Sequence, residues 1–205
     1  QAVKAAKDAN ALFCTLVTVR EDGFPTARIL GLRDIRVDES NNSNNSGALV
    51  VYVNQTSPKW QQLSAPNSKY EILLFWTQPH MLQYRLAGTD WTVVDEVEMQ
   101  SQYASKPQVA KYLDYYYAHH QAQSTVLEGG RPAFVNTMQQ IKAQFEEDSD
   151  SDLKQVPYSP TVVAGLVLQP SRIEEWRASP QDRWHERYRH EKTINGEWDT
   201  QALVP

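Results

Sequence analysis

Stretches that favour β-strands lie toward both ends of this chain, and a stretch that favours helices lies between them. Runs rich in Val, Ile, Leu, Tyr and Trp predict strands at Phe13–Val19, Thr26–Val37, Ala48–Asn54, Lys69–Thr77, Met81–Val94, Thr161–Leu168, Arg172–Trp176, Trp184–Thr193 and Glu197–Leu203. Turn signals separate the outermost pairs, Glu21-Asp22-Gly23 near the start and Asn195-Gly196 near the end. We therefore expect an α+β fold that is mainly β, with a closed or partly open barrel and helices outside it.

Composition, caps and apolar spacing predict four helices, over Ala2–Leu12, Ser57–Leu63, Lys106–His120 and Arg131–Glu147. In the second of these, Ser57 can cap the helix and Pro58 fits its first turn. Exposed polar connections are expected at Asn41–Gly47 and Asp148–Pro160.

The charge balance and the cysteine count exclude several kinds of partner. The chain has 20 Lys and Arg against 25 Asp and Glu, a formal net charge of -5, so nucleic-acid binding is not expected. Cys14 is the only cysteine, and in its apolar run it is expected to be a core thiol rather than a nucleophile. His119 and His120 diverge on a helix, so no metal site is expected. No apolar run is long enough to span a bilayer, which predicts a soluble, cytoplasmic protein without a membrane partner.

The segment before the last turn carries closely spaced positive charges. Alternate residues of a strand share a face, which would place Arg183, His185, Arg187 and Arg189 on one side. Because guanidinium groups bind phosphate through paired hydrogen bonds, such a stripe in an acidic protein fits a bound anion. A solvated face paired with some of the abundant carboxylates explains the pattern about equally well.

Two further places could receive an anion. Arg28 and Arg33 differ in parity, so on a regular strand they face opposite sides and one of them points toward a site. Gly31 between them allows a bulge or the close approach of a ligand, although packing explains it nearly as well. Ser57 and Lys59 flank a predicted helix start, where free amides favour an anion, but capping by Ser57 alone is the plainer explanation.

Other chemistry finds little support. The tyrosines of the helical middle occupy more than one helix face, so some must pack while a hydroxyl or two could reach a pocket; they are Tyr112, Tyr115, Tyr116 and Tyr117. The sequence lacks the G-x-S-x-G, P-loop and Rossmann glycine motifs of hydrolases, NTPases and dinucleotide-binding proteins.

A series of short motifs runs through nearly the whole chain in a fixed order. The motifs are Arg28-Ile29-Leu30-Gly31-Leu32-Arg33, Tyr52-Val53-Asn54, Ser57-Pro58-Lys59, Gln83, Gln123-Ser124, Trp176, Arg183-Trp184-His185-Glu186-Arg187, and the terminal Trp198, Leu203 and Pro205. Each motif is weak alone, but together their order resembles the pyridoxamine 5′-phosphate oxidase family of FMN-binding split barrels. The resemblance implies one domain over residues 1–205, built on a six-stranded antiparallel split β-barrel with flanking helices. Its helical insert would lie at about 106–147 and its C-terminal strands at about 161–205.

The resemblance also implies a homodimer with FMN bound in two symmetric clefts between protomers. The residues implied to bind FMN are Arg28, Ile29, Leu30, Tyr52, Val53, Ser57, Lys59, Gln83, Gln123, Ser124, Trp176 and Arg187, with Arg28 and Lys59 near its phosphate. The residues implied to bind the substrate are Arg33, Tyr112, Arg183 and His185. Arg183 and His185 are also the implied catalytic residues.

The activity implied is that of an oxidoreductase in pyridoxal phosphate biosynthesis. Hydride would pass from pyridoxamine or pyridoxine 5′-phosphate to FMN, and oxygen would then reoxidise the flavin with release of hydrogen peroxide. His185 is the best candidate for a direct role, because imidazole donates or accepts near neutral pH. However, Tyr116 and His120 stand where the family has an arginine and a serine, and Pro58 and Arg33 replace its arginine and lysine. Two alternatives therefore stay open, an FMN oxidoreductase with another substrate and a flavin-binding protein without turnover.

Overall fold

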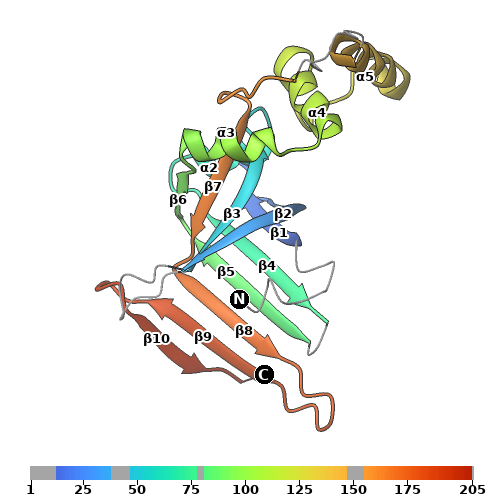
Figure 1. Ribbon diagram of the computed structural model, residues 1–205. Helices are drawn as coiled ribbons and strands as arrows, with labels where there is room; N and C mark the ends of the chain where they lie inside the picture. The colour runs from blue at the N-terminus through green and yellow to red at the C-terminus, as the bar shows by residue number, and fades with distance from the viewer. Residues whose placement is uncertain (1–12, 38–46, 78–80, 147–154, 205) are drawn as a thin grey trace. The chain divides into compact units, whose positions relative to one another are not determined.

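The computed structural model describes residues 13–37, 47–77, 81–146 and 155–204 (Figure 1). Within them, ten strands form one hydrogen-bonded sheet in the order β10-β9-β8-β5-β4-β1-β2-β3-β7-β6. The strands are β1 (Phe13–Val19), β2 (Pro25–Val37), β3 (Gly47–Asn54), β4 (Tyr70–Trp76), β5 (Leu82–Gly88), β6 (Asp90–Val93), β7 (Val163–Gln169), β8 (Arg172–Arg177), β9 (Glu186–Lys192) and β10 (Trp198–Ala202). From β10 through to β3, neighbouring strands pair antiparallel. A mainly antiparallel sheet was expected, but the described residues contain ten strands where the resemblance implied six.

The chain divides into two compact units. The first comprises Gln1–Tyr52, Gln62–Thr92 and Leu166–Pro205, and the second comprises Val53–Gln61 and Val93–Gly165. Most of the strands belong to the first unit. The second contains α3 (Glu96–Ala104), α4 (Gln108–His119) and α5 (Gly130–Glu146), while the short α2 (Pro58–Ser64) runs across the boundary. The single domain implied by the resemblance stays a prediction.

Residue alternation gives the sheet of the first unit two different faces. On the core face, Leu16 of β1 lies opposite Ile72 of β4, and both side chains are fully buried. On the other face, Phe13, Ile29 and Phe75 remain exposed. Large apolar side chains on one sheet face are normally covered by another surface, so this open face is a candidate contact surface.

Gly88, at the end of β5, is fixed by close packing. A Cβ atom at this position would lie 2.7 Å from Tyr70 Oη and 2.9 Å from the Gln169 carbonyl oxygen. Both distances are shorter than real Cβ contacts, so only glycine fits at this position without a shift of its neighbours.

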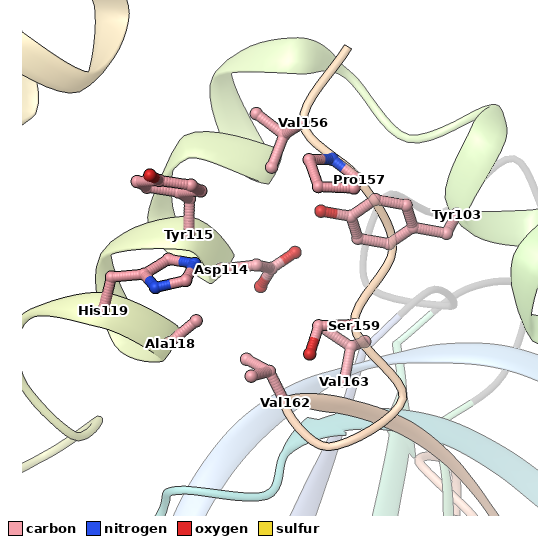
Figure 2. A pocket seen from close by; sticks show the side chains of 10 residues that line it. All are labelled: Tyr103, Asp114, Tyr115, Ala118, His119, Val156, Pro157, Ser159, Val162 and Val163. Carbon is pink, nitrogen blue, oxygen red and sulfur yellow. The ribbon is translucent and has the colours of Figure 1, made fainter. Parts of the chain in front are cut away.

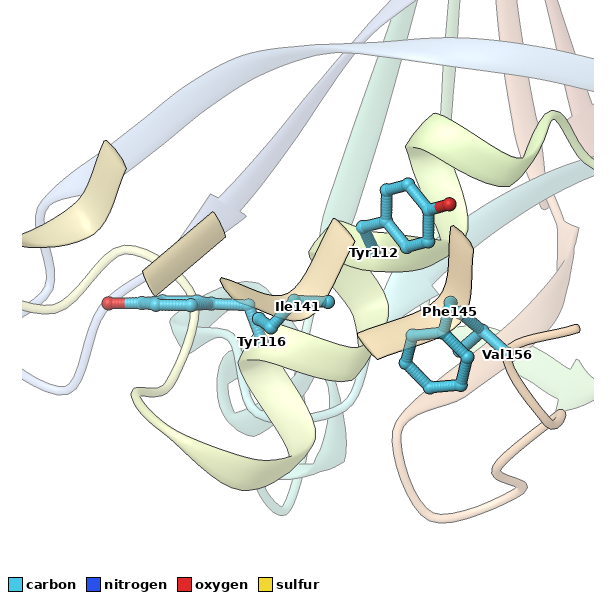
Figure 3. Close-up of a cluster of buried hydrophobic side chains, with 5 residues drawn as sticks. All are labelled: Tyr112, Tyr116, Ile141, Phe145 and Val156. Atoms are coloured by element: carbon cyan, nitrogen blue, oxygen red, sulfur yellow. The ribbon is translucent and has the colours of Figure 1, made fainter. Parts of the chain in front are cut away.

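The second unit has a core of its own between α4 and α5. Figure 3 shows its buried side chains, Tyr112, Tyr116, Ile141, Phe145 and Val156. The Tyr112 and Phe145 rings are stacked with centroids 6.1 Å apart. Val156 lies in the connection that was expected to be exposed, and this expectation is wrong at Val156, because its apolar side chain packs against the helices.

Helix α3 was not predicted from the sequence, although a start signal for it is present. The Asp95 side chain accepts hydrogen bonds from the backbone N–H groups of Val97, at 2.9 Å, and Glu98, at 3.3 Å. Asp followed three residues later by Glu is a capping signature. The strand expected over Met81–Val94 is divided at Thr89 into β5 and β6.

The other predicted elements are confirmed to within a few residues wherever the structure describes them. The helix expected over Ala2–Leu12, the loop before Gly47 and the acidic run beyond Glu146 lie outside the described residues. In the part of the chain that the structure describes, no helix combines the length and apolar character needed to cross a membrane.

Candidate functional site

Three residues implied to bind FMN form a row on the open face of the first unit. Gln83 of β5 lies opposite Trp176 of β8, which lies opposite Arg187 of β9. Directly opposed residues of antiparallel strands have Cβ atoms about 5 Å apart, so these side chains are neighbours. The sheet thus brings together residues that the helical middle separates in the sequence.

A buried carboxylate lies next to this row on the same face. Glu174 of β8 has a side chain that is 7% exposed, and it accepts hydrogen bonds from Arg187 Nη2, at 2.8 Å, and from Arg85. Arg189 Nε lies 3.6 Å from its other oxygen. Burial by itself would raise the pKa of Glu174, but the hydrogen bonds and charges of Arg187 and Arg85 outweigh it and lower the pKa to about 2. One ionised carboxylate therefore stands among three guanidinium groups.

The predicted four-residue cationic stripe is wrong in its first half. β9 begins only at Glu186, and Arg183 has a φ of +62°, so strand alternation does not extend back to Arg183 or His185. Arg187 and Arg189 do share a face, and both form ion pairs with Glu174. The alternative explanation, pairing with carboxylates, thus holds for these two arginines.

His185 is held in one tautomer by the segment before β9. The Ser179 backbone N–H donates to His185 Nδ1 at 3.0 Å, and the imidazole lies 4.9 Å from the Trp176 ring, centroid to centroid. A nitrogen that accepts a hydrogen bond carries no proton, so the neutral ring has its proton on Nε2. In this state His185 offers a hydrogen-bond donor at Nε2.

Arg28 lies on the core face of β2 among neutral oxygen atoms. Its guanidinium donates to the hydroxyls of Thr18, at 2.5 Å, and Thr26, at 2.7 Å, and to Gln62 Oε1 at 3.3 Å. No carboxylate accepts from it among the described residues, and burial lowers its pKa. A guanidinium whose charge has no counterion nearby fits a phosphate group. The sequence analysis missed Thr18, Thr26 and Gln62, because two threonines and a glutamine carry no distinctive signal.

Arg28 and Arg187 lie on opposite faces of the sheet. Arg28 is paired with Leu16, and the register from β1 through β9 places Leu16 on the face away from the row that contains Arg187. Ile29 points to the open face and is 72% exposed, whereas Leu30 returns to the core face. One copy of the chain therefore does not bring Arg28 and Arg187 together.

Arg33 and Tyr52 contact each other. The Arg33 guanidinium carbon lies 5.1 Å from the centroid of the Tyr52 ring and packs beside Gly31, 3.5 Å from where a Cβ would be. The pairing of β2 with β3 shifts between Leu32 and Asp34, so the bulge lies at Arg33. Because Arg33 is at this bulge, parity alone does not determine its side.

Lys59 and Gln123 are brought together in the second unit. Lys59 Nζ donates to Gln123 Oε1 at 2.7 Å, and the Gln123 backbone N–H donates to Thr56 Oγ1 at 3.0 Å. Thr56 Oγ1 donates in turn to Asn54 Oδ1 at 2.5 Å. The fully buried Ser57 hydroxyl donates to the Asn54 carbonyl oxygen at 2.6 Å. Two of the sequence motifs thus meet in one hydrogen-bonded group, and in it Ser57 closes the turn before α2.

Two residues, Ser124 beside this hydrogen-bonded group and Asn54 within it, carry an energetic cost that a bound ligand could offset. Ser124 has a φ of +65°, which is uncommon for a residue with a side chain. Asn54 Nδ2 is buried and has no hydrogen-bond partner, which costs about 1–3 kcal/mol. The sequence analysis included Asn54 only as part of the Tyr-Val-Asn motif. Its position just before the Ser-x-Lys motif is the sequence signal that could have identified it as a functional residue. Val53, also implied to bind FMN, is a core residue.

The tyrosines of α4 that matched or replaced family residues are packing residues. Tyr112 is buried and its hydroxyl donates to Glu146 at 3.1 Å. Tyr116 is also buried and stacks on His120 with ring centroids 5.4 Å apart. The positions at which the family has an arginine and a serine are therefore occupied by a stacked pair without a guanidinium group.

A small cavity in the second unit is unrelated to the residues above (Figure 2). It has a volume of about 40 Å³, and Tyr103, Asp114 and His119 are among its lining residues. This is room for ordered water but not for a flavin ring. Burial raises the pKa of Asp114, although its contact with Lys106 opposes the effect.

A larger pocket lies in the first unit beside the segment that holds His185. Its volume is about 510 Å³, and Tyr84, Ser179 and Trp184 are among its lining residues. This volume suits a small organic ligand. Ser179 connects the pocket to His185, but none of the residues implied to bind FMN or substrate lines it.

Comparison with known sequences gives consistent matches. A sequence model described as "Pyridoxamine 5′-phosphate oxidase, FMN-binding domain" matches residues 1–94. The chain is 32% identical over 192 residues to a pyridoxine/pyridoxamine 5′-phosphate oxidase of Gloeothece citriformis, covering 93% of this chain and 78% of the relative. It is 30% identical over 197 residues to the enzyme of the same name from Rhodopirellula baltica, covering 93% of this chain and 76% of the relative.

Comparison with solved structures shows the fold. PhzG of Burkholderia lata 383, crystallised with tetrahydrophenazine-1-carboxylic acid, superposes with a TM-score of 0.71 at 22% identity, covering 100% of this chain and 87% of the other. A pyridoxamine 5′-phosphate oxidase-related, FMN-binding protein of Nostoc punctiforme gives a TM-score of 0.65 at 16% identity, covering 96% and 90%. The predicted split-barrel class is confirmed by these two likenesses.

Proposed function

Because the chain belongs to the pyridoxamine 5′-phosphate oxidase family, whose characteristic domain binds FMN, we propose that it is an FMN-dependent oxidoreductase acting on a small substrate. The observation that carries this proposal is Arg28, a partly buried guanidinium that only neutral groups of the described chain contact. Removing such an unpaired charge from water costs free energy, and a bound anion would offset this cost.

The chain's residues fit FMN as the bound group. In the first unit Arg28 would hold its phosphate. In the second unit Lys59 and the unpaired Asn54 Nδ2 would each be a donor for an oxygen of a bound group. Gln83 would offer a polar contact to the flavin, and Trp176 a flat apolar surface. When bound, FMN would supply the hydride acceptor and, with oxygen, its own reoxidation.

The active protein is a homodimer in this proposal. Since Arg28 and Arg187 occupy opposite faces of one sheet, they can serve the same FMN only if they come from different copies. The open face that carries Arg187 also carries the exposed Phe13, Ile29 and Phe75, whose burial against a second copy would stabilise the pair.

His185 and Arg183 would act on the substrate. With Nδ1 engaged by Ser179, His185 would donate from Nε2 to an oxygen of the substrate and so orient it. Arg183 lies two residues before His185 and has a positive φ, a strained backbone conformation. This conformation fixes the direction in which the Arg183 side chain leaves the backbone. The hydride would leave from a substrate carbon and a proton from the attached oxygen or nitrogen, and because water can accept that proton, neither residue has to be a base of unusual pKa.

Pyridoxamine or pyridoxine 5′-phosphate is the first candidate substrate, on the basis of the curated relatives. A second candidate is a substrate that does not rely on the family's arginine and serine to hold a phosphate, because Tyr116 and His120 take their place. The PhzG structure, which holds a tetrahydrophenazine carboxylic acid, makes a partly reduced aromatic acid a sensible compound to test.

The first experiment is to purify the protein and record its absorbance. We expect a yellow protein with a flavin band at about 450 nm. Incubation under air with pyridoxamine 5′-phosphate should then give pyridoxal 5′-phosphate, ammonia and hydrogen peroxide. Yellow protein that is inactive on this substrate but oxidises a dihydro-aromatic acid would support the second candidate, and no turnover of either would support a flavin-binding protein. Colourless protein that takes up no added FMN would overturn the whole proposal.

The residue roles can be separated by two variants and a control. Arg187→Ala should weaken FMN binding by about tenfold or more, since a hydrogen bond to a charged group contributes about 1.5–3 kcal/mol. Arg183→Ala should keep the FMN affinity and raise KM. Arg20→Ala is a matched control, because Arg20 is exposed in a turn and pairs only locally with Asp22. Equal effects of all three substitutions would contradict the assigned roles.

A further inference from the structure

Glu174 is the shared partner of three arginines on the open face of the first unit. Arg85 and Arg189 lie directly opposite it on the neighbouring strands, whereas Arg187 lies opposite Trp176 and reaches Glu174 diagonally. Despite that diagonal position, Arg187 Nη2 makes a hydrogen bond of 2.8 Å to Glu174. The direction of the Arg187 side chain is thus set by the carboxylate as well as by its own strand position.

We propose that Glu174 is a positioning residue for the cofactor, holding Arg187 in the place where it contacts FMN. This inference rests on the proposed function, because it assumes that Arg187 is an FMN ligand. Glu174 itself is 7% exposed and lies beside the row, so it would act through Arg187 rather than by touching FMN.

Charge and burial explain why Arg187 depends on Glu174. Arg85, Arg187 and Arg189 are each about one-third exposed, and without the carboxylate their like charges would repel one another. Glu191, the other acidic partner of Arg189, is 4.0 Å away and half exposed, so it cannot take over this role. Arg187 lies opposite Trp176 and reaches Glu174 diagonally, so loss of the carboxylate would remove the hydrogen bond that directs its side chain.

Glu174 orders the arginines without cancelling their charge. Three positive groups surround one negative group, and Arg189 Nε is buried without a hydrogen-bond partner. The cluster therefore keeps an excess of positive charge and of donors for an electron-rich oxygen of a bound group. The ionised state of Glu174 agrees with this arrangement, because its pKa is about 2.

A double-mutant cycle on the full chain tests the proposal. The dissociation constant of FMN is measured by quenching of flavin fluorescence for the wild type, Glu174→Gln, Arg187→Ala and the double variant. We expect Glu174→Gln to weaken binding about tenfold, and the double variant to bind no more weakly than Arg187→Ala. Glu175→Gln is the matched control, because Glu175 is equally buried on the same strand but faces the other side and pairs with Arg177. Its FMN affinity should stay within about twofold of the wild type.

Each outcome decides the question. If Arg187→Ala weakens binding and Glu174→Gln does not, or if the two losses multiply in the double variant, the positioning role is refuted while the proposed function stands. If Arg187→Ala binds FMN like the wild type, the assignment of Arg187 fails, and the inference fails with it. If Glu174→Gln does not fold, Glu174→Asp replaces it, since it keeps the charge and loses the reach. Unchanged FMN affinity in that variant would likewise refute the proposal.

Discussion

Replacing Glu174 by glutamine should destabilise the fold by an amount that depends on pH. The glutamine has nearly the same shape but cannot become a carboxylate. It therefore mimics the protonated glutamic acid, and the comparison with the wild type isolates the charge that Arg85 and Arg187 stabilise. Because the side chain is 7% exposed, solvent screens this charge little.

The magnitude follows from the pKa of Glu174. The folded value of about 2 lies below the ordinary value of 4.5, so the ionised group stabilises the fold above pH 4.5 and loses that effect as the pH falls toward 2. At 1.36 kcal/mol per pH unit, the difference between 4.5 and about 2 corresponds to about 3 kcal/mol at pH 7. About 1 kcal/mol of this remains at pH 3.

Urea unfolding followed by tryptophan fluorescence measures the effect. The free energies of unfolding of the wild type and Glu174→Gln are compared at pH 7 and at pH 3, and their difference should shrink by about 2 kcal/mol between the two. An identical difference at both pH values would refute the reasoning, because it would mean that the loss comes from packing and not from the carboxylate charge.

Three further predictions concern other parts of the fold. Gly88→Ala should lower the free energy of unfolding by more than about 2 kcal/mol, since its Cβ would crowd Tyr70 and the Gln169 carbonyl, and an unchanged midpoint of thermal unfolding would contradict this. Asp95→Ala should cost about 1 kcal/mol in urea unfolding through loss of the α3 cap, whereas no loss would show that the cap is dispensable. Burial raises the pKa of the Cys14 thiol from 9.0 to about 11, so at pH 8 a thiol reagent should react about 100-fold more slowly with native than with unfolded protein, and equal rates would be evidence against a core position.

Several features of the fold could be predicted because local chemistry determines them. Strands β1 and β2 form the predicted hairpin across the turn at Gly23, where φ is +84°, and β9 and β10 turn at Gly196, where φ is +83°. Apolar alternation and turn residues act over a few positions, so they can be read along the chain. The order of the family motifs was also a sequence property, and the family assignment follows from it together with the comparisons.

Parity arguments failed wherever the backbone left the regular strand. The positive φ of Arg183 ended the predicted cationic stripe, and the bulge between Leu32 and Asp34 removed the simple relation between Arg28 and Arg33. A single non-extended residue changes the sheet face toward which the preceding side chains point. The residue types at these positions gave no signal of it.

The sequence by itself determined the types of most elements, though not helix α3, together with the family resemblance and the residue types available to an anion. Only the tertiary structure decided which of them are neighbours: that Glu174 joins Arg85 to Arg187, that Arg28 has neutral partners, and that Tyr112 packs in a helical core. The physical reason is that cross-strand register and helix packing depend on contacts between residues far apart in the chain. Burial then makes those contacts strong, because a charge removed from water must find its partner within the protein.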